Sequence, residues 1–181
     1  AISDNRALVK TQQGRPFEIK EMTAVELLIL GTEATWYVII DKNGDITSET
    51  YLDNDHMPVN GSSGYATLKS TYDDRRSVIR REYLNMDGEP MQITGGYAAI
   101  AYEYDNSDNK IRESYYDKSS ELTWCKDGYA EIIFTFNERN HCTGERLLNR
   151  QGQPALHGTY RYSSLVREVN ADGRVTSVKF F

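Results

Sequence analysis

Acidic side chains recur at a regular spacing in this sequence, and they are its most regular candidates for catalytic residues. Glu49, Glu113 and Glu145 are separated by multiples of 32 residues, and Glu82 lies one step from the same position. Two carboxylates about 5 to 10 Å apart can hydrolyse a glycosidic bond. Because each glutamate belongs to a different copy of a repeat, the spacing predicts a ladder of charges on neighbouring strands and no catalytic pair.

The remaining candidates for catalysis or metal binding are isolated. His56, His141 and His157 fall at different positions of the repeat, and no two of them have the spacing of metal ligands on a helix. The segment 41–45 (DKNGD) begins like a calcium loop, but it lacks glycine at the sixth position and has Leu52 where the bidentate glutamate should be. A tight turn is the better interpretation. We therefore predict a protein that is not an enzyme, with no catalytic residue, no metal ion and no cofactor.

Bulk composition argues against several classes of partner. The chain has 181 residues, of which 39% are apolar and 27% charged, and this is typical of a globular protein. Its formal net charge of −6 argues against binding to nucleic acid or to anionic lipid. The longest apolar run, Leu27 to Leu30, is far shorter than the roughly 20 residues of a membrane span, so we expect no membrane insertion. For Cys125 and Cys142, free or buried thiols are favoured, and a disulfide stays open.

A repeat of 32 residues organises the chain. The dipeptide Tyr-Ala at Tyr65 returns at Tyr97 and at Tyr129, and we number the positions of the repeat from this tyrosine as phase 1. Complete repeats begin at 33, 65, 97 and 129, and a partial repeat begins at 162 after a one-residue insertion. A fixed period of this size is typical of stacked supersecondary structures. We therefore divide the chain into an N-terminal cap with a degenerate partial repeat, 1–32, and a repeat array, 33–181.

Each repeat predicts two strands joined by turns. Phases 1 to 8 alternate and are rich in aromatic and β-branched residues, which indicates a β-strand. An Asp- and Asn-rich turn follows, and then a second strand at 46–52, 78–84 and 111–116. Segments punctuated by Gly and Pro lead to the next repeat, where Gly64, Gly96 and Gly128 predict a positive φ or a bend. The predicted fold is all-β, an array of antiparallel β-hairpin repeats. In the cap, Thr23 to Leu30 is slightly favoured as a short helix, and a buried strand stays open.

Tyrosine is the aromatic residue that this chain prefers, with 13 copies against 5 Phe and 2 Trp. It fills two rows, at phases 1 and 19. These rows are our candidates for ligand binding: Tyr65, Tyr97, Tyr129, Tyr51, Tyr83 and Tyr115. Aromatic faces stack on sugar rings, and tyrosine supplies contact area at a small cost in conformational entropy. Packing between repeats is the competing interpretation for each ring.

The pattern GYAxxxYxYDxxxNxxxExYYDxxGxP resembles the tyrosine-rich β-hairpin repeats of bacterial surface and secreted proteins. These include choline-binding and glucan-binding repeats, receptor-binding modules of repetitive toxins, and the YD repeats of Rhs-type proteins. The resemblance covers roughly residues 33 to 181 and consists in a shared combination of tyrosine, Asp turn, glycine and hairpin. It implies a non-catalytic module of the bacterial surface or secreted space, beside other domains in a longer protein.

Two functions therefore remain as predictions. The first is binding of a cell-envelope carbohydrate or a partner protein through the tyrosine rows, and the alternative is a structural spacer or stalk. The last strand ends in Phe180 and Phe181, which adjacent positions place on opposite faces of the sheet. An unpaired edge strand invites pairing with another chain, so we expect this end to be continued by further repeats or used for self-association.

Overall fold

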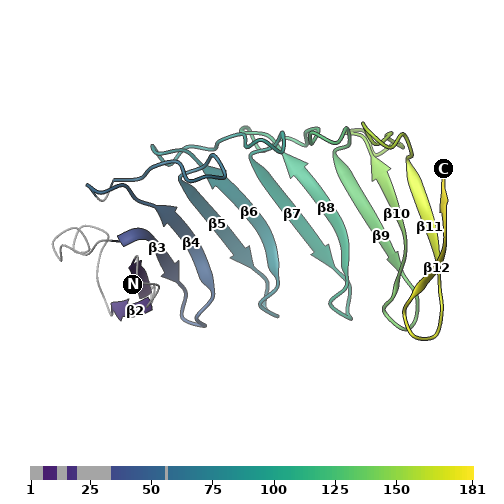
Figure 1. Cartoon of the computed structure of the whole chain (residues 1–181), viewed down its shortest axis with the longest axis horizontal. Coiled ribbons are helices and arrows are strands. Elements are labelled where there is room, and N and C mark those ends of the chain that lie inside the picture. Colours follow the sequence, from purple (N-terminus) through teal and green to yellow (C-terminus); the bar gives the residue numbers. More distant parts are fainter. Residues whose placement is uncertain (1–5, 12–15, 20–33, 56) are drawn as a thin grey trace. The chain divides into compact units, whose positions relative to one another are not determined.

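The computed structural model describes residues 6–11, 16–19, 34–55 and 57–181, and in these residues the protein is all-β (Figure 1). The predicted fold class is confirmed. The predicted helix at Thr23 to Leu30 lies outside the described residues. In the part of the chain that is described, no helix has the length and apolar character to cross a membrane. The contacts divide the chain into two compact units, Ala1–Ile93 (unit 1) and Thr94–Phe181 (unit 2), which are described separately.

Unit 1 is an antiparallel sheet with the strand order β2-β1-β3-β4-β5-β6. Its strands are β1 (Arg6–Thr11), β2 (Pro16–Ile19), β3 (Ala34–Ile40), β4 (Ile46–Tyr51), β5 (Thr67–Tyr72) and β6 (Val78–Leu84). The hairpins β3–β4 and β5–β6 are the predicted repeat hairpins. Both second strands, β4 and β6, begin at the residue that the sequence predicts.

Unit 2 is an antiparallel sheet whose strands follow the order of the chain, from β7 to β12. The strands are β7 (Ala99–Tyr104), β8 (Lys110–Tyr116), β9 (Glu131–Phe136), β10 (Cys142–Leu148), β11 (Ser164–Val169) and β12 (Val175–Phe180). The first strands β7 and β9 begin at phase 3 instead of phase 1. The chain is still turning at phase 1 because the preceding Gly96 and Gly128 have φ of 89° and 88°, as the sequence predicts.

The same type of turn occurs at both ends of the hairpins. In each turn, Oδ1 of an Asp or Asn accepts hydrogen bonds from the backbone N–H groups two and four residues later, at 2.8 to 3.0 Å. The residues that do this are Asp41, Asp73, Asp105, Asn137 and Asn170 at phase 9, and Asp53, Asn85, Asp117 and Asn149 at phase 21. The segment that begins like a calcium loop is one of these turns. A side chain that bonds its own backbone in this way needs no partner from elsewhere in the fold.

In the complete repeats of unit 2, side chains on both faces of the sheet are buried or half-buried at phases 19 and 20. On one face lies a row of buried side chains from successive strands: Ile100, Tyr115, Ile132, Leu147 and Leu165. The phase-20 side chain points to the other face, and in each complete repeat its residue forms a backbone β-bridge with phase 26, as in Tyr116 with Leu122 and Leu148 with Pro154. The segment that contains Pro154 thus folds back on its own hairpin, so one of the two predicted apolar rows packs within the array.

Candidate functional site

The two tyrosine rows interleave into one continuous line of rings in each unit. In unit 1, the Tyr65 ring centroid lies 5.9 Å from that of Tyr51 and 5.0 Å from that of Tyr83. In unit 2, the Tyr115 ring lies 4.8 Å from Tyr97 and 5.8 Å from Tyr129. Tilted and edge-on contacts at these distances are favourable aromatic pairs. We call each line a tyrosine ladder.

Strand register explains why the rows meet. The second strand of one repeat pairs with the first strand of the next, and this brings phase 19 beside phase 2. The backbone N–H of Tyr51 donates to the carbonyl of Ala66 at 2.9 Å, and that of Tyr115 donates to Ala130 at 3.0 Å. The residue before each alanine is the phase-1 tyrosine. The structure therefore places all six predicted tyrosines on the ladders, three in each unit.

The ladder of unit 2 extends through residues that the sequence analysis did not select. Its next ring is His157, 6.0 Å from Tyr129, followed by Tyr162 at 5.5 Å in a stacked arrangement. Phe180 continues the line 5.3 Å from Tyr162. Tyr162 and Phe180 occupy phases 1 and 19 of the partial repeat, so the repeat phase could have identified them. No such signal marks His157, because the same phase holds Gly61 and other non-aromatic residues elsewhere.

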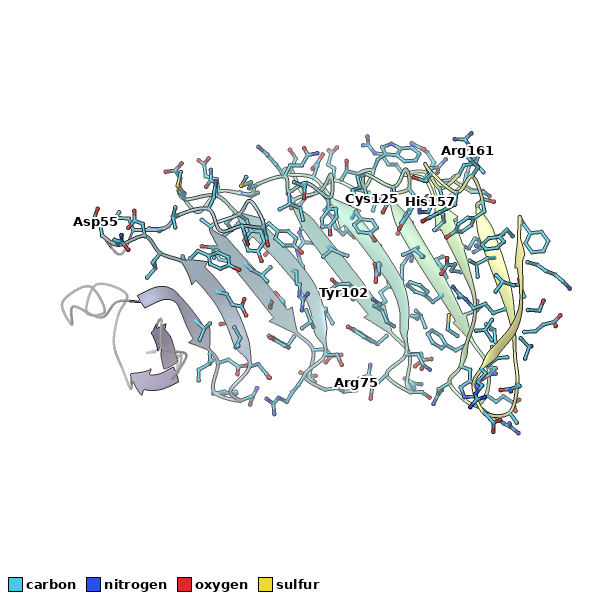
Figure 2. All side chains as sticks on the ribbon, viewed as in Figure 1. Asp55, Arg75, Tyr102, Cys125, His157 and Arg161 are labelled. Atoms are coloured by element: carbon cyan, nitrogen blue, oxygen red, sulfur yellow. The ribbon has the colours of Figure 1, made fainter. Side chains whose placement is uncertain are left out.

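The rings of the ladders are unequally exposed. Tyr115 is 7% exposed and belongs to the core, whereas the other five predicted tyrosines are half-buried. At the end of the unit 2 ladder, Tyr160 is 74% exposed and lies 4.8 Å from His157. Figure 2 shows that His157 and Arg161 lie along the same edge of unit 2 as Cys125. Half-burial holds a ring in a fixed orientation while part of its face stays open to a ligand.

Glycine residues let the backbone approach two of the rings. A Cβ atom at Gly61 would lie 2.7 Å from Cδ2 of Tyr51, and one at Gly95 would lie 2.6 Å from Cε1 of Tyr97. Distances this short are not found for real side chains, so any larger residue at either position would displace the ring. Gly61 and Gly95 therefore position the ladder as well as forming the loops that the sequence predicts.

The phenol groups of the ladders keep their protons well above neutral pH. Burial, helped by the neighbouring Tyr51 ring, raises the pKa of Tyr65 to about 12. Burial and a hydrogen bond to Glu145 raise the pKa of Tyr162 to about 12 as well. Burial also raises the pKa of Tyr115 and of Tyr129. Each of these hydroxyls is therefore a hydrogen-bond donor at neutral pH.

The recurrent glutamates lie beside the ladder of unit 2 and bind its hydroxyls. Glu113 accepts a hydrogen bond from the Tyr115 hydroxyl at 3.0 Å and also pairs with the ammonium of Lys110. Glu145 accepts a hydrogen bond from the Tyr162 hydroxyl at 2.9 Å. The two carboxylates belong to different strands, β8 and β10, and each has its own hydrogen-bond partners. This arrangement orients the tyrosines.

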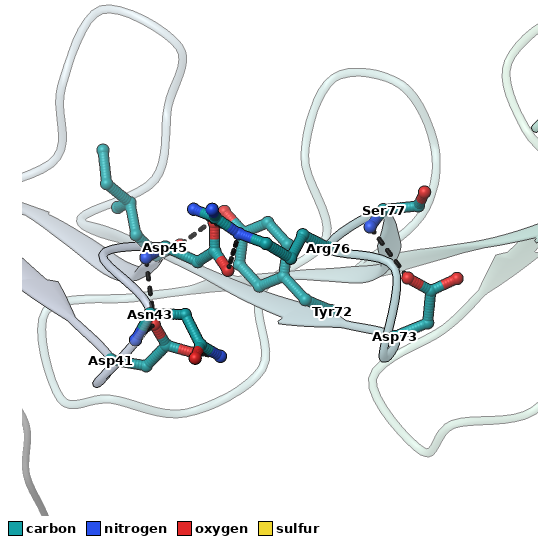
Figure 3. Close-up of polar contacts among 8 residues, drawn as sticks. Asp41, Asn43, Asp45, Tyr72, Asp73, Arg76 and Ser77 are labelled. Atoms are coloured by element: carbon teal, nitrogen blue, oxygen red, sulfur yellow. Dashed lines mark hydrogen bonds and ion pairs between the residues drawn. The ribbon is translucent and has the colours of Figure 1, made fainter.

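The turns at the opposite ends of the hairpins are joined by polar contacts. In unit 1, the guanidinium of Arg76 binds the carboxylate of Asp45 through Nε at 2.9 Å and Nη2 at 2.7 Å (Figure 3). The Tyr72 hydroxyl donates to the backbone carbonyl of Ile46 at 2.8 Å. In unit 2 the same two turn positions are linked by Asn109 Nδ2, which donates to Asn140 Oδ1 at 3.0 Å. These contacts pair polar groups of successive turns with one another.

The other residues singled out by the sequence do not assemble into a site. His56 lies outside the described residues, and His141 lies in the turn between β9 and β10. Cys125 is buried and Cys142 half-buried, and both are free thiols. Within the described segments, no three His, Cys, Asp or Glu side chains are grouped so that they could hold a metal ion.

Comparison with known proteins adds no relative to this picture: no family model matches the chain, and no curated protein matches it. The geometry of the ladders is thus the basis for assigning a function.

Proposed function

We propose that this chain is a non-enzymatic binding module that holds an extended glycan of the cell envelope along its tyrosine ladders. The supporting observation is the continuous line of rings in each unit, with centroids 4.8 to 6.0 Å apart, in which every predicted tyrosine except Tyr115 is half-buried. A bacterial surface or secreted location belongs to the same proposal. The resemblance to tyrosine-rich surface repeats is its second support.

The chemistry of the rings favours a sugar polymer. A pyranose ring has apolar C–H faces and a rim of hydroxyls, and a tyrosine offers a matching apolar face with one polar tip. The hydroxyl of Tyr65 keeps its proton at neutral pH and shares a hydrogen bond with Tyr51, so its oxygen can accept from a sugar hydroxyl. A repeating ligand can use a repeating row of rings. The net charge of −6 disfavours strongly anionic polymers, so a neutral glycan is the preferred class.

A spacer is the second candidate, and a specific observation favours it. The ladder rings contact one another, and contacts such as Arg76 with Asp45 join successive turns. Both features stabilise stacking along the array, which is what a stalk requires. In a spacer, the exposed part of each ring would have no ligand.

Calorimetric titration with soluble, neutral glycan strands prepared from cell walls separates the two functions. We expect saturable binding to the whole chain, weakened about tenfold in Tyr65→Ala, which corresponds to about 1.4 kcal/mol. Tyr65→Phe is the matched control, because it keeps the ring and removes only the hydroxyl, so it should bind more tightly than Tyr65→Ala. If the folded protein binds no such glycan at millimolar concentration, the spacer function is favoured instead.

A further inference from the structure

The outer edge of β12 carries unpaired backbone groups. Within the described part of unit 2, β12 is the terminal strand and pairs with β11 alone. Phe181 and Ser164 exchange backbone hydrogen bonds of 2.8 and 3.2 Å, so Phe181 points its N–H and C=O groups towards β11. Antiparallel strands alternate in this respect. Val178 and Phe180 therefore direct their N–H and C=O groups away from β11, to the open edge.

The same edge exposes large apolar side chains on both faces of the sheet. Phe180 is 60% exposed on one face and Phe181 is 64% exposed on the other. Val178, at 41%, lies on the face of Phe180, and so does Val175, because it pairs with Val169 beyond a register shift in β12. Contiguous exposure of this kind marks a surface for association. A strand edge combined with apolar side chains fits another β-strand better than it fits a small ligand.

The charges of β12 suit a second copy of the same strand. In earlier repeats, the second strand pairs with the next hairpin around phase 17, where Glu49, Glu113 or Glu145 stands. A two-fold axis through such a glutamate would bring two carboxylates together. In β12 phase 17 is Val178, so a two-fold axis there opposes two valines.

We propose that β12 pairs antiparallel with β12 of a second copy of this chain, with Val178 on the two-fold axis. The pairing continues the sheet through the phases that β4, β8 and β10 already use within the units. It is isologous, and it gives the outward backbone groups of the edge strand their partners. This proposal does not depend on glycan binding.

The register follows from matching side chains across that axis. Centred on Val178, it sets the two Val178 side chains opposite each other and Ser177 opposite Lys179 of the second copy, so that no like charges face each other. Lys179 also keeps its ion pair with Glu168, at 3.5 Å. A register centred on Ser177 would instead place on the axis a residue whose N–H and C=O groups point towards β11.

Sedimentation velocity over a concentration series of the 181-residue chain tests the pairing. We expect a reversible monomer–dimer equilibrium with no larger species. Val178→Lys places two ammonium groups at the axis and should leave only monomer at concentrations where the unchanged chain is dimeric. Val178→Thr, which is β-branched and uncharged, should keep the dimer. Val166→Lys changes an equally exposed apolar residue of β11, away from the open edge, and should also keep the dimer.

A second variant guards against misfolding as the cause of a lost dimer. Val178→Pro removes an N–H that only the second copy would use, and proline is accepted at such edge positions. It should abolish the dimer while the melting temperature of the monomer changes little. A strict monomer at every concentration, a dimer that survives both Val178→Lys and Val178→Pro, or growth into open-ended assemblies would each overturn the proposal.

Discussion

The two ends of the hairpins in each unit share one type of turn but differ in the contacts that join neighbouring repeats. At the turn between the strands of a hairpin, Asp41 or Asp105 binds its own backbone, and pairs such as Asp45 with Arg76 join successive turns. At the end where one hairpin leads to the next, tyrosine rings contact one another along the ladder. Polar pairs join neighbouring repeats in the first region, whereas aromatic rings, most of them half-buried, join them in the second.

This difference indicates which region can bind a partner. In each turn, Oδ1 of the side chain is already bound by two backbone N–H groups and so holds the turn together. A half-buried ring has an ordered orientation and an open face, and it gives up only water when a ligand covers it. The comparison therefore places the proposed binding function on the ladders and a structural function on the turns.

The largest effect should come from the most buried ring of a ladder. Tyr115→Ala removes a core side chain and the donor to Glu113, so we expect it to lower the free energy of unfolding by about 3 kcal/mol or more. Tyr160→Ala is the matched control, because the exposed ring should matter by less than about 0.5 kcal/mol. Urea denaturation of both variants measures the two costs. Equal costs would show that burial does not distinguish these rings.

A turn should contribute less, and the effect should depend on one oxygen atom. Asp105→Ala removes the acceptor for the N–H groups of Ser107 and Asn109, and we expect a loss of about 1 kcal/mol. Asp105→Asn keeps the oxygen, as Asn137 and Asn170 do at the same phase, and should be close to neutral. The same denaturation experiment decides. If Asp105→Asn costs as much as Asp105→Ala, the charge and not the turn geometry is important.

Stability should respond to alkaline pH through the ladders and to acid pH through the turns. The pKa of Tyr65 and that of Tyr162 are raised from 10.0 to about 12 in the folded protein, chiefly by burial. Above pH 10 the unfolded chain loses these protons first, so their stabilisation is complete below pH 10 and is lost as the pH rises through about 12. Thermal melts between pH 8 and 12 should show this fall, and it should be smaller in Tyr65→Phe.

At acid pH, stability should depend on the turns, and there it should fall as the pH decreases. Hydrogen bonds from the backbone, that of Asp45 above all, hold the pKa of Asp41 below its usual 3.8. The stabilisation by Asp41 is therefore present above pH 3.8 and is lost as the pH falls through the lower folded value. Melts of Asp41→Asn should lack this part of the acid transition. An unchanged acid transition would contradict the turn hydrogen bonds.

The smallest effect should come from the ion pair between turns. Arg76→Lys loses the paired contacts of the guanidinium with Asp45, which are solvent-exposed. Such pairs contribute little and are screened by salt. We expect a slight loss of melting temperature at low salt that disappears at 1 M NaCl. A large, salt-independent loss would mean that the turns do more than join their neighbours.

The repeat predicts the strands more completely than it predicts the contacts between them. Alternation and the 32-residue period place β6 at Val78–Leu84 correctly, because local pattern determines strand position. The sequence marks the turn at Asp117 only as part of the Gly- and Pro-rich punctuation, although the hydrogen bonding of its side chain is the same as at Asp105. The sequence also does not predict that the two tyrosine rows meet. The register between β8 and β9 brings Tyr115 beside Tyr129, and this register is a long-range property.

The ladder as a ligand surface is tested most directly by the ring signals of the tyrosines themselves. In NMR spectra of tyrosine-labelled protein titrated with a neutral cell-wall glycan, the rings of Tyr65 and Tyr129 should shift in a saturable way. The ring of Tyr72, whose hydroxyl already donates to Ile46 at the turn, should stay unchanged. Saturable shifts confined to the ladders are the result that we predict. Ladder signals that do not move at saturating glycan, or a shift of Tyr72 as large as theirs, would contradict it.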